Sequence, residues 1–200
     1  MGCDVLHIVG ARPNFVKMAP VYQQLKTLKV KQKILHSGQH YDKNMSEDFF
    51  KDLGIPDPNI NLRIAGGTHA DQTARAMVGI ERAIKNIKPK IVVVYGDVNT
   101  TLAGAISAKK ENVYVVHVES GLRSGDITMP EEQNRIMVDS ISDLLFVTEE
   151  SGIKNLETEG SADRAILVGN TMIDSLRKIT DQLDNQERAL AEEHGYQHGN

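Results

Sequence analysis

The sequence is poor in aromatic residues and cysteine, and it contains no tryptophan. Aromatic residues make up 4% of the 200 residues, which argues against a stacking platform for single-stranded nucleic acid. The formal net charge is −4, so a protein built mainly to bind nucleic-acid phosphates is not expected. Cys3 is the single cysteine. An intrachain disulfide is therefore excluded, which fits a reducing compartment.

Long apolar runs are also absent. No run approaches the ~20 residues that a helix needs to cross a bilayer. The N-terminus has no apolar stretch of the kind found in secretory signals. We therefore expect a cytoplasmic protein that has neither a membrane segment nor a membrane partner.

What the chain does have is a regular alternation of short apolar runs and longer helical patterns. This alternation predicts an α/β fold: a Rossmann-like, doubly wound parallel sheet with helices on both faces. We place the domain at residues 1–180 and expect residues 181–200 to form a charged helix and a linker. Strands are predicted at residues 5–9, 33–36, 60–64, 91–95, 113–118, 144–147 and 165–168, and helices near Pro13 and at residues 46–53, 69–87, 99–110 and 131–141.

Acidic residues follow two of these strands and open a later helix. Asp97 follows one strand, Glu119 follows the next, and Glu131 begins the helix after that. In a parallel sheet, Asp97 and Glu119 would leave the carboxyl edge, where open α/β sheets bind ligands. Three carboxylates there could carry out general acid–base chemistry. His117 precedes Glu119 by two residues and is expected to share its side of the strand.

Each acid also has a purely structural interpretation. Asp97 or Asn99 could cap the following helix. Glu119 could form an ion pair with Arg123 that shapes the loop. An acid in a first helical turn, such as Glu131, is favoured by the helix dipole in any case.

Basic residues accompany the acids. Arg12 and Lys17 follow Gly10 at the start of the first helix, where unpaired N–H groups and the dipole favour an anion. The alternative is an ordinary strand-to-helix turn with a surface arginine. The glycine spacing of the dinucleotide fingerprint is missing, which disfavours NAD. Together with Arg123, these residues favour acid–base chemistry on a substrate that carries phosphate.

A series of ordered motifs resembles one known family. The chain is similar to the non-hydrolysing UDP-N-acetylglucosamine 2-epimerases from about residue 5 to residue 174. The motifs that carry the resemblance are Gly10-Ala11-Arg12-Pro13 with Lys17-Met18-Ala19-Pro20, Gly38-Gln39-His40, Gly96-Asp97 with Asn99-Thr100, the segment from His117 to Arg123, Pro130-Glu131-Glu132 with Asn134-Arg135, and Gly169-Asn170-Thr171.

The resemblance implies a glycosyltransferase-B-type architecture, of which this chain is the N-terminal half. The C-terminal domain, with most of the uridine and diphosphate contacts and a catalytic histidine, would lie outside it. Family members convert UDP-N-acetylglucosamine into UDP-N-acetylmannosamine for surface polysaccharides by eliminating and re-adding UDP through a glycal. They require no metal or redox cofactor and are commonly homodimers, so a UDP-sugar substrate and a homodimeric partner are expected.

The resemblance also implies roles for individual residues. Asp97, Glu119 and Glu131 are the expected catalytic acid–base groups. Asn14 stands where many members have glutamate, which makes the helix start less acidic. Gln39 and His40 resemble residues near a second, allosteric UDP-sugar site of some bacterial members. The predicted substrate-binding residues are Arg12, Lys17, Gln39, His40, Arg123 and Arg135.

Three functions are compatible with the sequence at this point. The first is half of an epimerase for UDP-N-acetylglucosamine or a related UDP-sugar. The second is a glycosyltransferase-like domain, which the ordered acids argue against. The third is a non-catalytic sugar-nucleotide-binding or regulatory domain, which the short length favours and the retained acids disfavour. An excised domain and a natural truncation would both account for the length.

Overall fold

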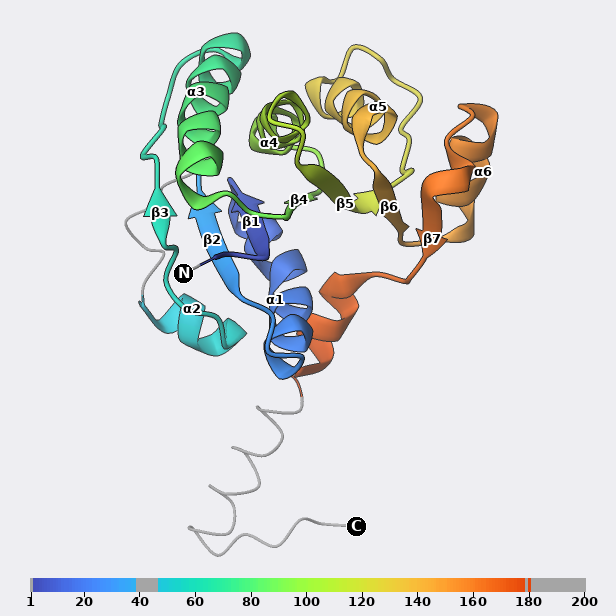
Figure 1. The fold of residues 1–200 in the computed structure, drawn as a ribbon. Helices are drawn as coiled ribbons and strands as arrows, with labels where there is room; N and C mark the ends of the chain where they lie inside the picture. Colours follow the sequence, from blue (N-terminus) through green and yellow to red (C-terminus); the bar gives the residue numbers. More distant parts are fainter. Residues whose placement is uncertain (1, 39–46, 179, 181–200) are drawn as a thin grey trace, which may run out of the picture.

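The computed structural model of the chain describes residues 2–38, 47–178 and 180. Within them lies a seven-stranded sheet of order β3-β2-β1-β4-β5-β6-β7. Every neighbouring pair of strands is parallel. Helices cover both faces of the sheet (Figure 1). The predicted doubly wound α/β fold is therefore confirmed.

Strands and helices alternate along the chain. The strands are β1 (Val5–Val9), β2 (Gln32–His36), β3 (Ile60–Asn61), β4 (Ile91–Tyr95), β5 (Tyr114–Ser120), β6 (Leu144–Val147) and β7 (Ala165–Leu167). The helices are α1 (Arg12–Thr27), α2 (Glu47–Leu53), α3 (His69–Ile87), α4 (Asn99–Lys110), α5 (Pro130–Ile141) and α6 (Glu150–Thr158), with a 3-10 helix at Ala162–Arg164 and helical residues at 171–178.

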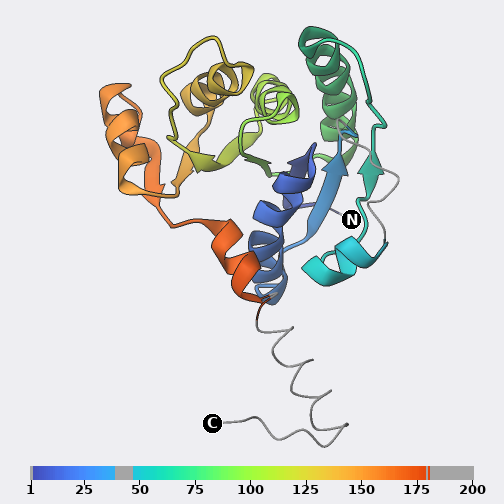
Figure 2. The ribbon, with the colours of Figure 1, turned by 180° about the vertical axis from the view of Figure 1, so that it is seen from behind.

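The strand side chains alternate between two hydrophobic cores, one on each face of the sheet. Leu6 and Ile8 of β1 belong to the core beneath α3, α4 and α5. Val5 and Val9 belong to the opposite core, together with Phe15 of α1. Figure 2 shows the same two layers from behind. This period of two is what a strand buried on both faces requires.

The centre of the sheet contains a topological switch point. From β1 the chain passes through α1 to β2 on one side, and from β4 it passes through α4 to β5 on the other. Helices α1 and α4 lie on opposite faces (Figure 1). Open α/β sheets bind ligands at the carboxyl ends of the strands that flank such a point. The expected ligand edge is therefore at the ends of β1, β4 and β5.

Most predicted boundaries agree with the structure, and the differences are local. The strand expected at 113–118 continues to Ser120, so Glu119 belongs to the strand and not to the loop. The strand expected at 60–64 is limited to Ile60–Asn61. Residues 181–200, expected to form a charged helix and linker, lie outside the described residues.

Helical residues 171–178 return from the β7 edge to α1 (Figure 2). The hydroxyl of Ser175 donates a hydrogen bond to the carbonyl of Val16 at 2.7 Å. Among the described residues, no helix is long and apolar enough to span a membrane.

Candidate active site

The predicted carboxylates Asp97 and Glu119 lie at neighbouring strand ends. Tyr95, the last residue of β4, pairs in register with Val118 of β5. The N–H of Gly96 then donates to the carbonyl of Val118 at 3.0 Å. Asp97 and Glu119 therefore leave the sheet at the same edge, as the sequence predicted.

Lys17 of α1 joins this edge to the helix that follows β1. Its Nζ lies 2.8 Å from Oε1 of Glu119. The same Nζ lies above Gly96, since a Cβ on that residue would stand only 2.9 Å from it. Gly96 also adopts a φ of 64°. A glycine between Lys17 and the sheet thus leaves room for the lysine to reach Glu119.

Side chains from four elements hold the turn that carries Asp97. Three successive carbonyls of this turn each accept hydrogen bonds from buried side chains, so the turn cannot shift without breaking several of them. The donors are Asn14 Nδ2 and Thr101 Oγ1 to the carbonyl of Tyr95, His117 Nε2 to that of Gly96, and Asn134 Nδ2 to that of Asp97, at distances between 2.7 and 2.9 Å.

The Asp97 carboxylate faces Arg135 of α5. Arg135 donates to Oδ2 of Asp97 from Nε at 3.0 Å and from Nη2 at 2.6 Å. Capping of α4 by Asp97 or Asn99, the structural alternative, is wrong: Val98 is the capping residue and makes no side-chain cap. The carboxylate is thus oriented by a cation and keeps 23% of its side chain exposed.

The same arginine binds a second carboxylate, that of Glu132. Its Nη1 donates to Glu132 Oε2 at 2.8 Å, and the backbone N–H groups of Ser124 and Gly125 also donate to this carboxylate. Burial would raise the pKa of Glu132, but these donors outweigh it and lower the pKa to about 2. Glu132 therefore anchors the loop between β5 and α5. The sequence offered no sign that distinguished it from Glu131.

Glu131 is placed differently from its neighbour. Its side chain is partly buried at the first turn of α5. Within the described residues it forms neither a hydrogen bond nor an ion pair. Of the three predicted catalytic acids, it is the one whose carboxylate is not already engaged by the part of the protein that the structure describes.

The end of β5 turns sharply around Glu119. Glu119 has a φ of 72° and Gly121 a φ of 80°, and the pairing of β5 with β6 shifts register here. As a result, His117 contacts Asp139 of α5, whereas Glu119 contacts Lys17 of α1. The expectation that His117 and Glu119 share one side of the strand is wrong, because the left-handed backbone reverses the alternation.

Arg123 does not pair with Glu119, contrary to the structural alternative. Its Nη2 lies 2.8 Å from Oδ2 of Asp139, and its Nε and Nη2 donate to Glu159 at 2.7 and 2.6 Å. Burial would lower the pKa of Arg123, but these carboxylates raise it. In this geometry Arg123 fastens the loop after β5 to α5 and to Glu159 beyond α6.

Arg12 stands exposed at the first position of α1, with its guanidinium carbon 5.9 Å from the ring centre of Phe49. The helix start beside it offers fewer free N–H groups than expected. Oδ1 of Asn14 accepts from the N–H groups of Gly10 and Ala11, both at 3.0 Å. Attraction of an anion here would therefore depend mainly on the Arg12 side chain. The predicted residues 39 and 40 lie outside the described part of the chain.

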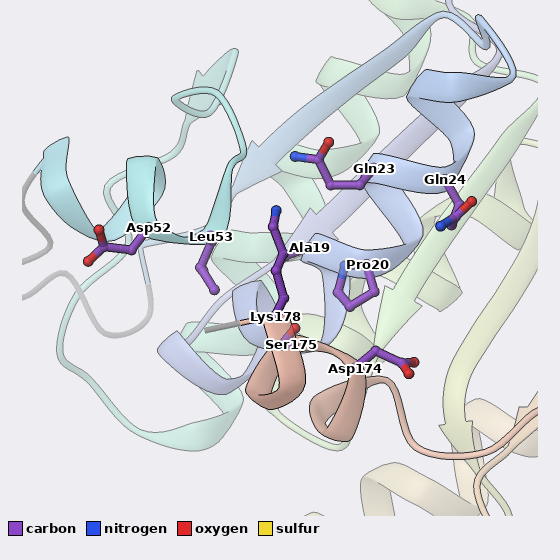
Figure 3. Close-up of a pocket in the computed structure, with 9 residues that line it drawn as sticks. All are labelled: Ala19, Pro20, Gln23, Gln24, Asp52, Leu53, Asp174, Ser175 and Lys178. Atoms are coloured by element: carbon purple, nitrogen blue, oxygen red, sulfur yellow. The ribbon is translucent and has the colours of Figure 1, made fainter. Parts of the chain in front are cut away.

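A cavity of about 310 Å³ lies elsewhere, between α1, α2 and the helical residues 171–178 (Figure 3). Lys178 extends toward Gln23 across it, while Asp174 points away. Of the predicted catalytic and substrate-binding residues that the structure describes, none lines it. This cavity is thus separate from the strand ends.

In the site at the ends of β4 and β5, each carboxylate is paired with a cation. Lys17 faces Glu119, and Arg135 faces Asp97. Within residues 2–38, 47–178 and 180, no group of three or more histidine, cysteine, aspartate or glutamate side chains could hold a metal ion. The arrangement can bring two carboxylates and two cations to a polar substrate.

Comparison with known proteins gives a consistent result. A sequence profile described as UDP-N-acetylglucosamine 2-epimerase matches residues 23–198. The UDP-N-acetylglucosamine 2-epimerase of Methanocaldococcus jannaschii is 44% identical over 169 residues, which cover 84% of this chain and 46% of that protein. The UDP-2,3-diacetamido-2,3-dideoxy-D-glucuronate 2-epimerase of Pseudomonas aeruginosa is 47% identical over 175 residues, covering 86% and 49%.

Solved structures agree. The crystal structure of the M. jannaschii enzyme in complex with UDP-GlcNAc and UDP superposes with a TM-score of 0.83 at 43% identity, covering 86% of this chain and 48% of that one. MurG of Acinetobacter baumannii, at 14% identity and a TM-score of 0.60, shares the fold alone. The chain spans about half the length of these relatives and matches their N-terminal part.

Proposed function

Because the chain belongs to the UDP-N-acetylglucosamine 2-epimerase family, we propose that it supplies the acid–base half of an enzyme that converts UDP-N-acetylglucosamine into UDP-N-acetylmannosamine for surface polysaccharides. One observation carries this proposal. Asp97 and Glu119 leave adjacent strand ends, and each is oriented by a cation from a helix. Such preorganised groups are what proton transfer at a single carbon requires.

The chemistry explains why carboxylates are needed. The C2 proton of the sugar is not acidic until the C1–O bond to UDP breaks and its electron pair leaves with UDP. Removal of the C2 proton then forms the C1–C2 double bond of a glycal. A proton returned to the opposite face of C2, followed by attack of a UDP oxygen on C1, completes the inversion.

Each predicted residue has a place in this scheme. Asp97 and Glu119 come from two different strands and could serve the two faces of C2. Glu131, whose carboxylate no described residue engages, is available to assist the loss and return of UDP. Lys17 and Arg12 would face the negatively charged substrate. Arg123 and Arg135, which already bind carboxylates, would act on the substrate by holding Asp97 and the neighbouring loop in place.

A related UDP-sugar is the second candidate substrate. The Pseudomonas aeruginosa relative acts, by its name, on UDP-2,3-diacetamido-2,3-dideoxy-D-glucuronate, and it is as similar to this chain as the UDP-N-acetylglucosamine epimerases are. The same acid–base chemistry at C2 would serve either sugar, because the two differ in their substituents at C3 and C6.

The isolated 200-residue chain is expected to have negligible epimerase activity. It corresponds to about half of its relatives, so much of the surface that would exclude water and retain UDP after it leaves is supplied by the other half. The test joins this chain to the C-terminal half of the M. jannaschii relative and follows UDP-N-acetylglucosamine and UDP-N-acetylmannosamine by NMR. The relative's own two halves, joined in the same way, are the control.

We expect turnover by the joined protein and none by the chain alone. Turnover of only the diacetamido sugar would select the second substrate. Rapid turnover by the isolated chain would refute the requirement for the other half. If the control is active while the joined protein binds UDP without converting either sugar, the non-catalytic alternative is correct.

A further inference from the structure

A buried imidazole connects the two turns that carry Asp97 and Glu119. The side chain of His117 is fully buried. Its Nε2 lies 2.8 Å from the carbonyl oxygen of Gly96, the residue before Asp97. Its Nδ1 lies 2.6 Å from Oδ1 of Asp139. The ring is thus attached to the first turn directly and to α5 through a carboxylate.

Asp139 completes the connection to the second turn. Its Oδ2 accepts the N–H of Gly121, two residues beyond Glu119, at 3.0 Å. Arg123 approaches the same oxygen at 2.8 Å. Burial would raise the pKa of Asp139, but the His117 ring, the Gly121 N–H and Arg123 lower it below its ordinary value. The carboxylate therefore acts as an acceptor for all three neighbours.

Both nitrogens of His117 consequently face oxygen acceptors, so each of the two contacts needs its own N–H. A second buried histidine of the sheet, His7, is different. Its Nδ1 faces the hydroxyl of Tyr95, which can donate, and its Nε2 faces the side-chain oxygen Oε1 of Gln32. One N–H is enough for His7, whereas both nitrogens of His117 lie beside acceptors.

We propose that the His117–Asp139 pair is a positioning device that fixes the Asp97 turn and the Glu119 turn relative to each other. This inference rests on the proposed function, in which the carboxylates of Asp97 and Glu119 act at one carbon of the sugar. The backbone needs such support at Glu119, whose φ of 72° is a left-handed conformation that costs energy for a residue with a Cβ. A displacement of about 1 Å between catalytic groups can cost a factor of about 100 in rate.

The first test uses the chain alone and does not depend on activity. Backbone amide signals are compared by NMR between the unmodified chain and Asp139→Asn. Asp139 is connected to Gly96 through the His117 ring. Asn134 and Arg135 of the same helix also contact Asp97, so the signal of Gly96 is the one that reports on the route through His117. We expect signals of both turns to shift, together with the ring signals of His117.

Asn155→Ala is the matched control, because Asn155 Nδ2 donates to the carbonyl of Gly121 at 2.9 Å and, within the described part of the chain, forms no hydrogen bond with His117. It should shift Gly121 and leave Gly96 unchanged. If Asp139→Asn also leaves Gly96 unchanged, the proposal is overturned. Asp139→Glu, which keeps the charge and moves the oxygens, replaces Asp139→Asn should that variant fail to fold.

The second test measures turnover in the joined protein. His117→Asn should lower kcat by about 10- to 100-fold and change KM by less than about threefold, because substrate contacts are retained. His7→Asn removes an equally buried ring away from the strand ends and should change kcat less than twofold. Equal losses for both variants would show a merely structural role. Absence of turnover in the unmodified joined protein would refute the proposed function and leave the NMR result as the test of the positioning pair.

Discussion

The Nζ of Lys17 and Oε1 of Glu119 lie 2.8 Å apart with 8% and 16% of their side chains exposed. This ion pair connects α1 to the end of β5 across the β4 turn. Removal of one member of such a pair leaves an uncompensated charge in a poorly hydrated place, which costs more than the pair itself contributes. The pair is therefore important both for the stability of the site and for its orientation.

Lys17→Met tests the stability contribution. We expect the free energy of unfolding to fall by about 3 kcal/mol, and the double variant Lys17→Met/Glu119→Gln to recover most of that loss, since no charge is then stranded. Urea denaturation measures all three proteins. The control is Lys85→Met, because Lys85 pairs with Glu81 while 54% exposed, and its loss should be far smaller than that of Lys17→Met. Equal losses for Lys17 and Lys85 would contradict the argument.

Alanine substitution at Gly121 and at Gly125 tests how closely the turn after β5 is packed. Both have positive φ, 80° and 77°. A Cβ on Gly121 would stand 2.6 Å from the carbonyl oxygen of Gly152, whereas a Cβ on Gly125 meets nothing within 4 Å. Gly125→Ala should therefore cost about 1 kcal/mol from backbone strain, and Gly121→Ala about 3 kcal/mol or more, because a clash with backbone is added. Thermal unfolding of the two variants decides; similar melting temperatures would be the contrary result.

His7 makes stability depend on pH. Burial lowers its pKa from 6.5 to about 4, against the opposing effect of the hydrogen bond to Gln32. Between pH 6.5 and pH 4 the unfolded chain therefore takes up a proton that the folded chain does not. The free energy of unfolding should fall as the pH is lowered through this window, and the contribution of His7 should level off below it.

The variant His7→Asn isolates this contribution. Across the window, its unfolding free energy should depend on pH less steeply than that of the unmodified chain, by up to about 1.4 kcal/mol per pH unit. Urea denaturation at pH 7, 5.5 and 4.5 gives both slopes. Identical slopes for the two proteins would show that His7 is not the group responsible.

The fold and the edge of the site could be predicted because they depend on local patterns. Apolar runs such as Ile91–Tyr95 and the alternation with helices define a parallel sheet, and a parallel sheet places Asp97 and Glu119 at one edge. The partners of those acids could not be predicted, because Lys17 and Arg135 reach them from distant parts of the chain.

The contacts of His117 could not be predicted from the sequence either. Counting residues along a regular strand places His117 and Glu119 together, but the count fails where Glu119 adopts a φ of 72°. The polar neighbour that His117 meets instead, Asp139, lies in the last turn of α5 and belongs to no motif. A buried aspartate on the apolar side of a helix is the only sequence signal that could have pointed to it.

The most direct test of the account concerns proton removal at C2. In the joined protein, Asp97→Asn and Glu119→Gln keep the shape of each side chain and remove its ability to accept a proton. Each should lower turnover by about 10²- to 10⁴-fold and weaken substrate binding far less, since the contribution is largest in the transition state.

The measurement is incorporation of deuterium at C2 of the UDP-sugar in D₂O, followed by NMR together with epimerisation and substrate affinity. The account predicts that deuterium incorporation and epimerisation fall in parallel in both variants, because both require the same proton removal. If either variant exchanged the C2 hydrogen and epimerised at the rate of the unmodified protein, that residue would have a structural role only, and the acid–base assignment would be wrong.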